Sequence, residues 1–254
     1  MIRSPSLGDP GFLLPERKDR IDRAVAQRTR TLVVVMEAFC DPQNVNAVLR
    51  TCDAFGVQEV HVVEGPMKPY TRNKKVSQNA DKWLDVVRWK TTASCLDALE
   101  ARGFAVYATD LGSGSRGLGE LPFAGKVALV FGNERRGVSD EALARAGGRY
   151  AIPMRGFVKS LNVSVAVALS LAGAVERREQ ERGRHGDLED DEAAALRERF
   201  YLQAVKQRSR IAKAEAVQAR ALAGRAERRA RSGEATRHKP GPTQQIVAGR
   251  RRRG

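Results

Sequence analysis

The feature that most constrains the fold is an alternation between short, wholly apolar runs and segments with helical spacing. The clearest run is 32–36, Leu-Val-Val-Val-Met, which contains no polar residue. Such a run is typical of a strand that is buried on both faces of a parallel sheet. This order of elements predicts right-handed crossovers and an α/β fold, with a parallel sheet and helices on both faces. The further strands are expected over 57–64, 104–109, 126–131 and 149–152, and the helices over 44–55, 93–101 and 140–146.

The long apolar run over 161–175 is compatible with two kinds of structure. Val163, Val165 and Val167 alternate with small residues, which could indicate a strand. The length of the run and its alanines favour a helix that is buried on all sides. We therefore expect a helix here, preceded by a polar loop.

The net charge of +15 lies almost entirely at the two ends of the chain. Residues 1–31 carry a net charge of +3 and residues 32–198 carry −1, whereas residues 199–254 hold 16 Lys/Arg against 3 Asp/Glu, a net charge of +13. Segregated cationic arms attract polyanions, and this favours a nucleic-acid partner over a tail that only keeps the protein soluble. Composition divides the chain into a flexible N-terminus (1–15), a basic helix (16–30), an α/β domain (31–176), a charged helical extension (177–231) and a disordered basic tail (232–254).

Several classes of protein are disfavoured by the composition. The chain has three cysteines without a Cys-x-x-Cys spacing and three scattered histidines, which argues against a disulfide framework and against a metal site. It has no apolar run of eighteen residues and no signal-like N-terminus, so we expect neither a membrane span nor secretion. We expect a cytoplasmic protein that uses no metal.

Three polar segments adjoin the apolar elements, at 44–50, 131–140 and 153–166. Carboxyl ends of parallel strands are where α/β proteins bind ligands, so these segments are candidates for one site. Asn44 and Arg50 lie nearly two helical turns apart, and both could border one groove. A guanidinium there suits a phosphate or a developing oxyanion, although a lone arginine on a helix is more often simply exposed.

The other two segments contribute Glu134, Ser160 and Asn162. Glu134 lies beside an asparagine and between glycines, which favours a role in a site over a surface ion pair with Arg135 or Arg136. Ser160 and Asn162 could cap the following helix, and capping is compatible with ligand contact.

The loop at 112–117, Gly-Ser-Gly-Ser-Arg-Gly, matches the glycine pattern of a dinucleotide-binding turn. That pattern should open a helix whose N-terminus binds pyrophosphate. Gly119 and Pro122 follow at once and the next clear element is a strand, so a nicotinamide oxidoreductase is the weakest interpretation.

Taken together, the three polar segments resemble the motifs of the SPOUT superfamily of methyltransferases, and within it the TrmH family of tRNA ribose 2′-O-methyltransferases. The resemblance covers roughly residues 16–205, with motifs at 44–57, 131–139 and 152–166. It implies that 31–176 forms a SPOUT methyltransferase domain with a deep C-terminal trefoil knot, flanked by basic helices. It also implies a homodimer with the active site at its interface.

The resemblance implies a substrate, a cofactor and a set of site residues. The reaction would be S-adenosylmethionine-dependent methylation of a ribose 2′-hydroxyl in RNA, at a guanosine of the tRNA D-loop of the position-18 type. Arg50 and four supporting residues would be catalytic, and Arg50 would act beside the knot of the partner. Because a guanidinium hardly ever loses its proton, we expect Arg50 to hold a phosphate and stabilise negative charge rather than act as a base. The implied residues are Asn44, Arg50, Glu134, Ser160 and Asn162 for catalysis, Thr109, Gly132, Ile152, Met154 and Leu161 for the cofactor, and Arg20, Arg28 and Arg50 for RNA.

Two features depart from the family pattern. Gln43 stands where family members often carry a histidine, and the arginine-rich extension is unusually long. Two alternatives therefore stay open: 2′-O-methylation of ribosomal RNA, and a non-catalytic RNA-binding protein that keeps the fold.

Overall fold

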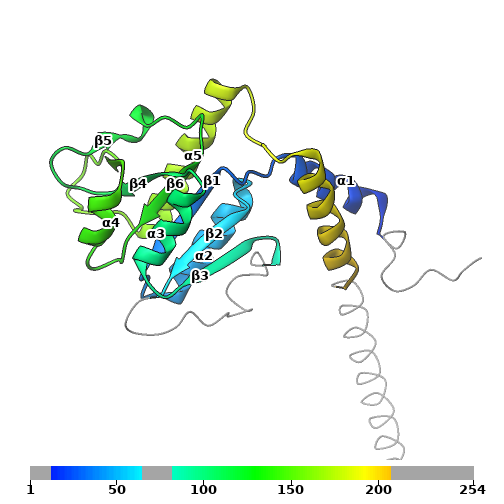
Figure 1. Ribbon diagram of the computed structural model, residues 1–254, viewed down its shortest axis with the longest axis horizontal. Coiled ribbons are helices and arrows are strands. Elements are labelled where there is room, and N and C mark those ends of the chain that lie inside the picture. The colour runs from blue at the N-terminus through cyan, green and yellow to red at the C-terminus, as the bar shows by residue number, and fades with distance from the viewer. Residues whose placement is uncertain (1–12, 65–81, 207–254) are drawn as a thin grey trace, which may run out of the picture.

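The computed structural model describes residues 13–64 and 82–206, which contain a seven-stranded sheet in the order β3-β2-β1-β6-β4-β7-β5 (Figure 1). Every pairing between neighbouring strands is parallel, which confirms the predicted α/β class. The strands are β1 (Leu32–Glu37), β2 (Glu59–Val63), β3 (Asp85–Trp89), β4 (Ala105–Thr109), β5 (Arg116–Gly117), β6 (Val127–Phe131) and β7 (Gly148–Ala151).

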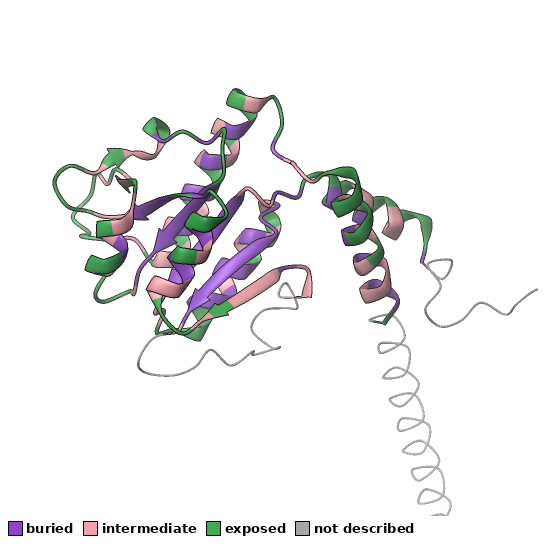
Figure 2. Cartoon of the chain, viewed as in Figure 1, coloured by how far each residue is buried: buried purple, intermediate pink, exposed green. Residues whose placement is uncertain are grey.

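Helices cover both faces of this sheet, as predicted. Side chains of β1 alternate between the two faces. Leu32 and Val34 pack with α2 (Pro42–Ala54) and α5 (Val163–Arg182) in one core. Val33 and Val35 pack with α3 (Thr92–Ala101) and α4 (Asp140–Arg145) in the other. The central strands are buried along their whole length, and they are purple in Figure 2.

Helix α5 differs from the expectation in two respects. It extends to Arg182, so it crosses the composition boundary suggested at residue 176. It is also not buried on all sides, because Val165 and Leu169 are 45% and 46% exposed. The helix packs on the sheet through the stripe that contains Val167 and Leu171, and its opposite face carries apolar side chains into solvent.

The two ends of the described chain pack together beside the sheet. Helix α1 (Pro15–Ala26) lies next to a helix over residues 190–206, blue and gold in Figure 1. Ile21 and Val25 of α1 share an apolar cluster with Phe200, and the Trp83 ring meets Phe200 edge-on with a centroid distance of 5.0 Å. The expected basic helix thus ends at Ala26 rather than at residue 30. Most of the predicted flexible N-terminus, residues 207–231 of the extension and the whole basic tail lie outside the described residues.

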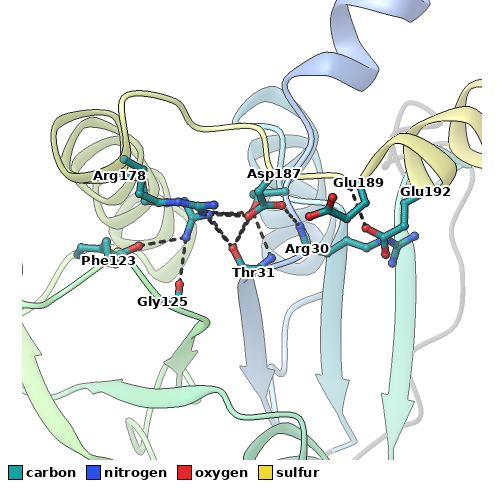
Figure 3. A network of polar contacts seen from close by, with 10 residues as sticks. Arg30, Thr31, Phe123, Gly125, Arg178, Asp187, Glu189 and Glu192 are labelled. Carbon is teal, nitrogen blue, oxygen red and sulfur yellow. Dashed lines mark hydrogen bonds and ion pairs between the residues drawn. The ribbon is translucent and has the colours of Figure 1, made fainter.

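A buried polar network joins this helix pair to the sheet (Figure 3). The Asp187 carboxylate accepts hydrogen bonds from the Arg178 Nη2 atom at 2.7 Å and the Arg30 amide at 2.9 Å. It also accepts from the hydroxyls of Thr29, at 2.6 Å, and Thr31. The Arg178 side chain is fully buried and the Asp187 side chain is 3% exposed. Since these residues come from α5, from the segment just before β1 and from the segment after α5, the network fixes how the C-terminal helix leaves the domain.

The glycine-rich loop contains no helix at its start. It leads into the two-residue strand β5 and a 3₁₀ turn over Leu118–Glu120, which is consistent with a nicotinamide oxidoreductase being the weakest interpretation. Within residues 13–64 and 82–206, no helix is long and apolar enough to cross a membrane. The trefoil knot stays a prediction.

Candidate active site

A cavity lies at the carboxyl ends of four neighbouring strands. It has a volume of about 1130 Å³ and is lined by the segments that follow β1, β6, β4 and β7. All three polar segments singled out in the sequence contribute to its wall. The structure therefore brings segments that are far apart in the sequence to one place, as expected for ligand sites of parallel sheets.

Three polar side chains, one from each segment, form a connected chain at this cavity. The Asn44 amide nitrogen donates to the Glu134 carboxylate at 2.8 Å, and the Asn162 amide nitrogen donates to the Asn44 Oδ1 atom at 3.2 Å. Asn162 also caps α5, because its Oδ1 atom accepts a hydrogen bond from the Ser164 amide at 2.8 Å. Capping and site contact thus coexist in Asn162. Ser160 lines the same cavity but does not cap α5.

The Glu134 carboxylate organises the loop that follows β1. It accepts hydrogen bonds from the backbone amides of Cys40 at 3.1 Å and Asp41 at 3.5 Å. Partial burial raises the pKa of Glu134, but the hydrogen bonds from Asn44 and from these amides outweigh it, so its pKa lies below the ordinary value. Glu134 is therefore an anion whose oxygens are already engaged, and neither Arg135 nor Arg136 is paired with it.

Asn133 is a residue that the sequence reasoning left without a role. Its Nδ2 atom donates to the Ala38 carbonyl at 2.6 Å, and its Oδ1 atom accepts from the Arg135 amide at 2.9 Å. It therefore ties the loop after β6 to the loop after β1. Ala38 has a positive φ of 53°, which is uncommon for a residue with a side chain. The only signal in the sequence was the position of Asn133 between Gly132 and Glu134.

All five residues expected to contact the cofactor line this cavity: Thr109, Gly132, Ile152, Met154 and Leu161. Their side chains are mainly apolar, and they lie on the loops after three different strands. Gly132 has no room for a side chain, because a Cβ atom there would lie 2.1 Å from the backbone of Gly137 and Val138. The mixed apolar and polar lining of the cavity is typical of sites for small ligands and cofactors.

Arg50 is not part of this cavity. Residues six apart on an α-helix are rotated by about 120° from each other, so the groove expected to hold both Asn44 and Arg50 does not form. Asn44 is turned inward and is 9% exposed, whereas Arg50 is exposed on the outer face of α2. Our expectation that they border one groove is wrong within a single chain.

The two arginines expected to bind RNA near the N-terminus differ in their settings. Arg20 is exposed on α1, which is compatible with that role. Arg28 is 3% exposed, is ion-paired with Asp53 and lies 5.6 Å from the centroid of the Phe200 ring. Arg28 is therefore a structural residue between α2 and the C-terminal helix, and the prediction that it contacts RNA is corrected.

The part of the chain that the structure describes contains no group of three or more His, Cys, Asp or Glu side chains placed to hold a metal ion.

Comparisons with known proteins agree with this geometry. A family model described as the SpoU rRNA Methylase family matches residues 31–172. The chain is 34% identical over 195 residues to the tRNA (guanosine(18)-2′-O)-methyltransferase of Borreliella burgdorferi, covering 77% of this chain and 88% of that protein. It is 40% identical over 162 residues to the enzyme of the same name from Thermus thermophilus, covering 64% and 83%.

Solved structures give the same result. The crystal structure of the A. aeolicus TrmH/SpoU tRNA modifying enzyme is 30% identical, with a TM-score of 0.67, and the match covers 75% of this chain and 97% of that one. An rRNA methyltransferase from Sinorhizobium meliloti, solved with AdoMet bound, is 25% identical, with a TM-score of 0.52 and coverages of 61% and 59%.

Proposed function

Because the chain belongs to the SpoU methylase family, we propose that it transfers a methyl group from S-adenosylmethionine to a ribose 2′-hydroxyl of RNA. The preferred substrate is a guanosine at position 18 in the D-loop of tRNA, the nucleotide named for the relatives above. The observation that carries this proposal is the convergence of three separated polar loops on one cavity through the contacts of Asn44, Glu134 and Asn162. The cytoplasm, where tRNA is modified, is the expected location.

S-adenosylmethionine supplies an electrophilic methyl group on a sulfonium, so no metal is needed to activate the leaving group. The chain itself must hold the reactants in line and exclude water. Thr109, Gly132, Ile152, Met154 and Leu161 would hold the cofactor, and Asn44, Glu134, Ser160 and Asn162 would keep the loops and the ribose in register. The anionic Glu134 lies where a positive charge on the ligand would be favoured.

Arg50 would meet the ribose from a second protomer. Its guanidinium would hold a phosphate and stabilise the charge that develops on the 2′-oxygen. This role requires a homodimer, because Arg50 is exposed and lies outside the cavity of its own chain. Apolar side chains that a second copy would cover also lie exposed in the same region of the fold, namely Phe157, Val158, Val165 and Leu169.

The first experiment incubates the protein with labelled S-adenosylmethionine and transcripts of tRNA and ribosomal RNA. Ribose methylation leaves a nuclease-resistant dinucleotide, and mapping it identifies the nucleotide. Methylation of ribosomal RNA alone would select the alternative substrate. Cofactor binding by calorimetry with no methylated product from any RNA would favour a non-catalytic RNA-binding protein, and absence of both would refute the proposal.

The second experiment tests Arg50 and the dimer together. Arg50→Ala should lose methylation while its affinity for S-adenosylmethionine survives. Mixing it with Glu134→Ala, itself inactive, should restore activity, because one site of each mixed dimer would contain neither lesion. Random exchange of protomers predicts recovery to about a quarter of the wild-type rate. No recovery, with exchange verified by mass spectrometry, would exclude an Arg50 that acts across the interface.

A further inference from the structure

Three cations at the rim of the active-site cavity have no carboxylate partner within residues 13–64 and 82–206. Arg135 and Arg136 follow Glu134 in the loop after β6, and Lys159 lies in the loop after β7. Each of the three is exposed to solvent and lines the cavity. Loops from two different strands thus bring positive charge to one opening.

Several other arginines of this domain are held by carboxylates. Most arginines of the sheet and its helices are ion-paired, including Arg102 with Glu59, Arg145 with Asp97 and Arg149 with Asp110.

Carboxylates are present near the rim, but they are used elsewhere. Glu134 binds the amides of the neighbouring loop and Asn44. Asp110 binds Arg149, and Asp41 caps α2 by accepting from the Gln43 amide at 2.8 Å. Asp140 lies in the first turn of α4, where a negative charge is favoured by the helix dipole. The rim cations therefore stay available for an external anion.

The loop that carries two of these cations is held in one shape. The Asn133 Oδ1 atom accepts hydrogen bonds from the Arg135 and Arg136 amides, at 2.9 and 3.3 Å, and the Gly137 amide donates to the Asn133 carbonyl at 2.8 Å. Ordering this backbone in advance reduces the entropy that binding would otherwise cost.

We propose that Arg135, Arg136 and Lys159 form a phosphate clamp that binds the RNA backbone next to the nucleotide whose ribose enters the cavity. Arginine suits phosphate because its guanidinium donates two hydrogen bonds at once, and lysine adds a point charge. The clamp rests on the proposed function. It sets the register of the RNA on the cavity without reading sequence, as phosphate contacts do.

The test measures how RNA affinity depends on salt. Each phosphate contact contributes about 0.7 to 0.9 to the slope of log affinity against log salt, so the triple variant R135Q/R136Q/K159Q should lose about 2 to 3 from that slope. Each single variant should lose about 0.7 to 0.9. The control is Lys126→Gln, an exposed lysine just before β6, at the amino-terminal end of the strands and thus at the opposite end of the sheet from the cavity. Its slope should equal that of the wild type.

Two further measurements show whether a reduced salt slope comes from lost RNA contacts, from lost cofactor contacts or from a disrupted protein interface. Calorimetry of the triple variant with S-adenosylmethionine should give an affinity within about twofold of the wild type. The reason is that a clamp that binds only the RNA backbone does not contact the cofactor. A much weaker cofactor affinity would assign the cations to the cofactor and overturn the proposal. A change in oligomeric mass by ultracentrifugation would assign them to a protein interface and also overturn it.

Failure of the clamp and failure of the proposed function are distinguishable. A wild-type protein that methylates RNA, together with a triple variant whose salt slope is unchanged, refutes the clamp alone. A wild-type protein that methylates no RNA refutes the proposed function, whatever the slopes.

Discussion

The buried network around Arg178 allows a quantitative prediction about stability. Its guanidinium donates to the Phe123 carbonyl at 3.2 Å and the Gly125 carbonyl at 3.4 Å, in addition to Thr31 and Asp187. Arg178→Met keeps most of the buried volume but removes every one of these donors. The Asp187 carboxylate would then lose the fully buried one of its two arginine partners.

The expected loss of stability in Arg178→Met depends on the partners that Asp187 keeps. Removing one partner of a buried ion pair typically costs about 3 to 5 kcal/mol. Asp187 would keep the Thr29 hydroxyl, the Arg30 amide and the Arg182 guanidinium, which is 3.2 Å away, so the lower end applies. A loss of about 3 kcal/mol lowers the melting temperature of a protein of this size by roughly 6 to 12 °C.

Urea unfolding followed by circular dichroism measures this directly, provided that the m-value is unchanged. The control is Arg177→Met, next to it on α5. Arg177 is 38% exposed, and among the described residues it is ion-paired only with Glu181, at 2.7 Å and one turn away, a type of pair worth about 0.3 to 0.5 kcal/mol. If Arg178→Met shifts the midpoint no further than Arg177→Met, the network does not stabilise the fold as we argue.

Three further predictions concern other parts of the chain. Burial raises the pKa of Asp187, but hydrogen bonds from Thr29, Thr31 and the Arg30 amide, and the charge of Arg178, lower it overall. The stability that its charge contributes is present above about pH 4 and is lost below it, so the difference in unfolding free energy between wild type and Asp187→Asn should shrink on acidification. Gly132→Ala should destabilise the protein by more than about 2 kcal/mol and abolish cofactor binding in calorimetry, whereas Gly119→Ala, which has open space around it, should stay within about 0.5 kcal/mol. Deleting residues 232–254 should weaken RNA affinity and flatten its salt dependence, and an unchanged slope would mean that the tail makes no contact with RNA.

The central strands were predictable because burial on both faces demands an uninterrupted apolar sequence. β1 and β6 are of this kind, and they match the expected ranges almost residue for residue. The edge strands lack that signal. No residue of β3 is fully buried, so it can contain Asp85 and Arg88, and β5 has only two residues. The end of α5 was also missed, since its last turns carry charged side chains while the apolar pattern stops earlier.

The composition of the site was more predictable than its geometry. Polar residues that interrupt apolar elements marked Asn44, Glu134 and Asn162, and these do meet around one cavity. The orientation of single arginines was not predictable in this way. Arg28 is buried by Phe200 and Asp53, which are distant in the sequence, and no local pattern distinguishes it from the exposed Arg20.

Asn44 and Arg50 point in different directions from the same helix. Both belong to α2, yet the helix turns one toward the cavity and the other toward solvent, and no side-chain rotation can reverse that. If Asn44 and Arg50 both act on the same ribose, then Arg50 must come from the α2 helix of a second protomer. The dimer and the role of Arg50 are therefore a single hypothesis, whereas the loop contacts of Asn44, Glu134 and Asn162 are complete within one protomer. Cofactor binding should accordingly require only a folded single protomer, whereas methyl transfer should require two paired protomers.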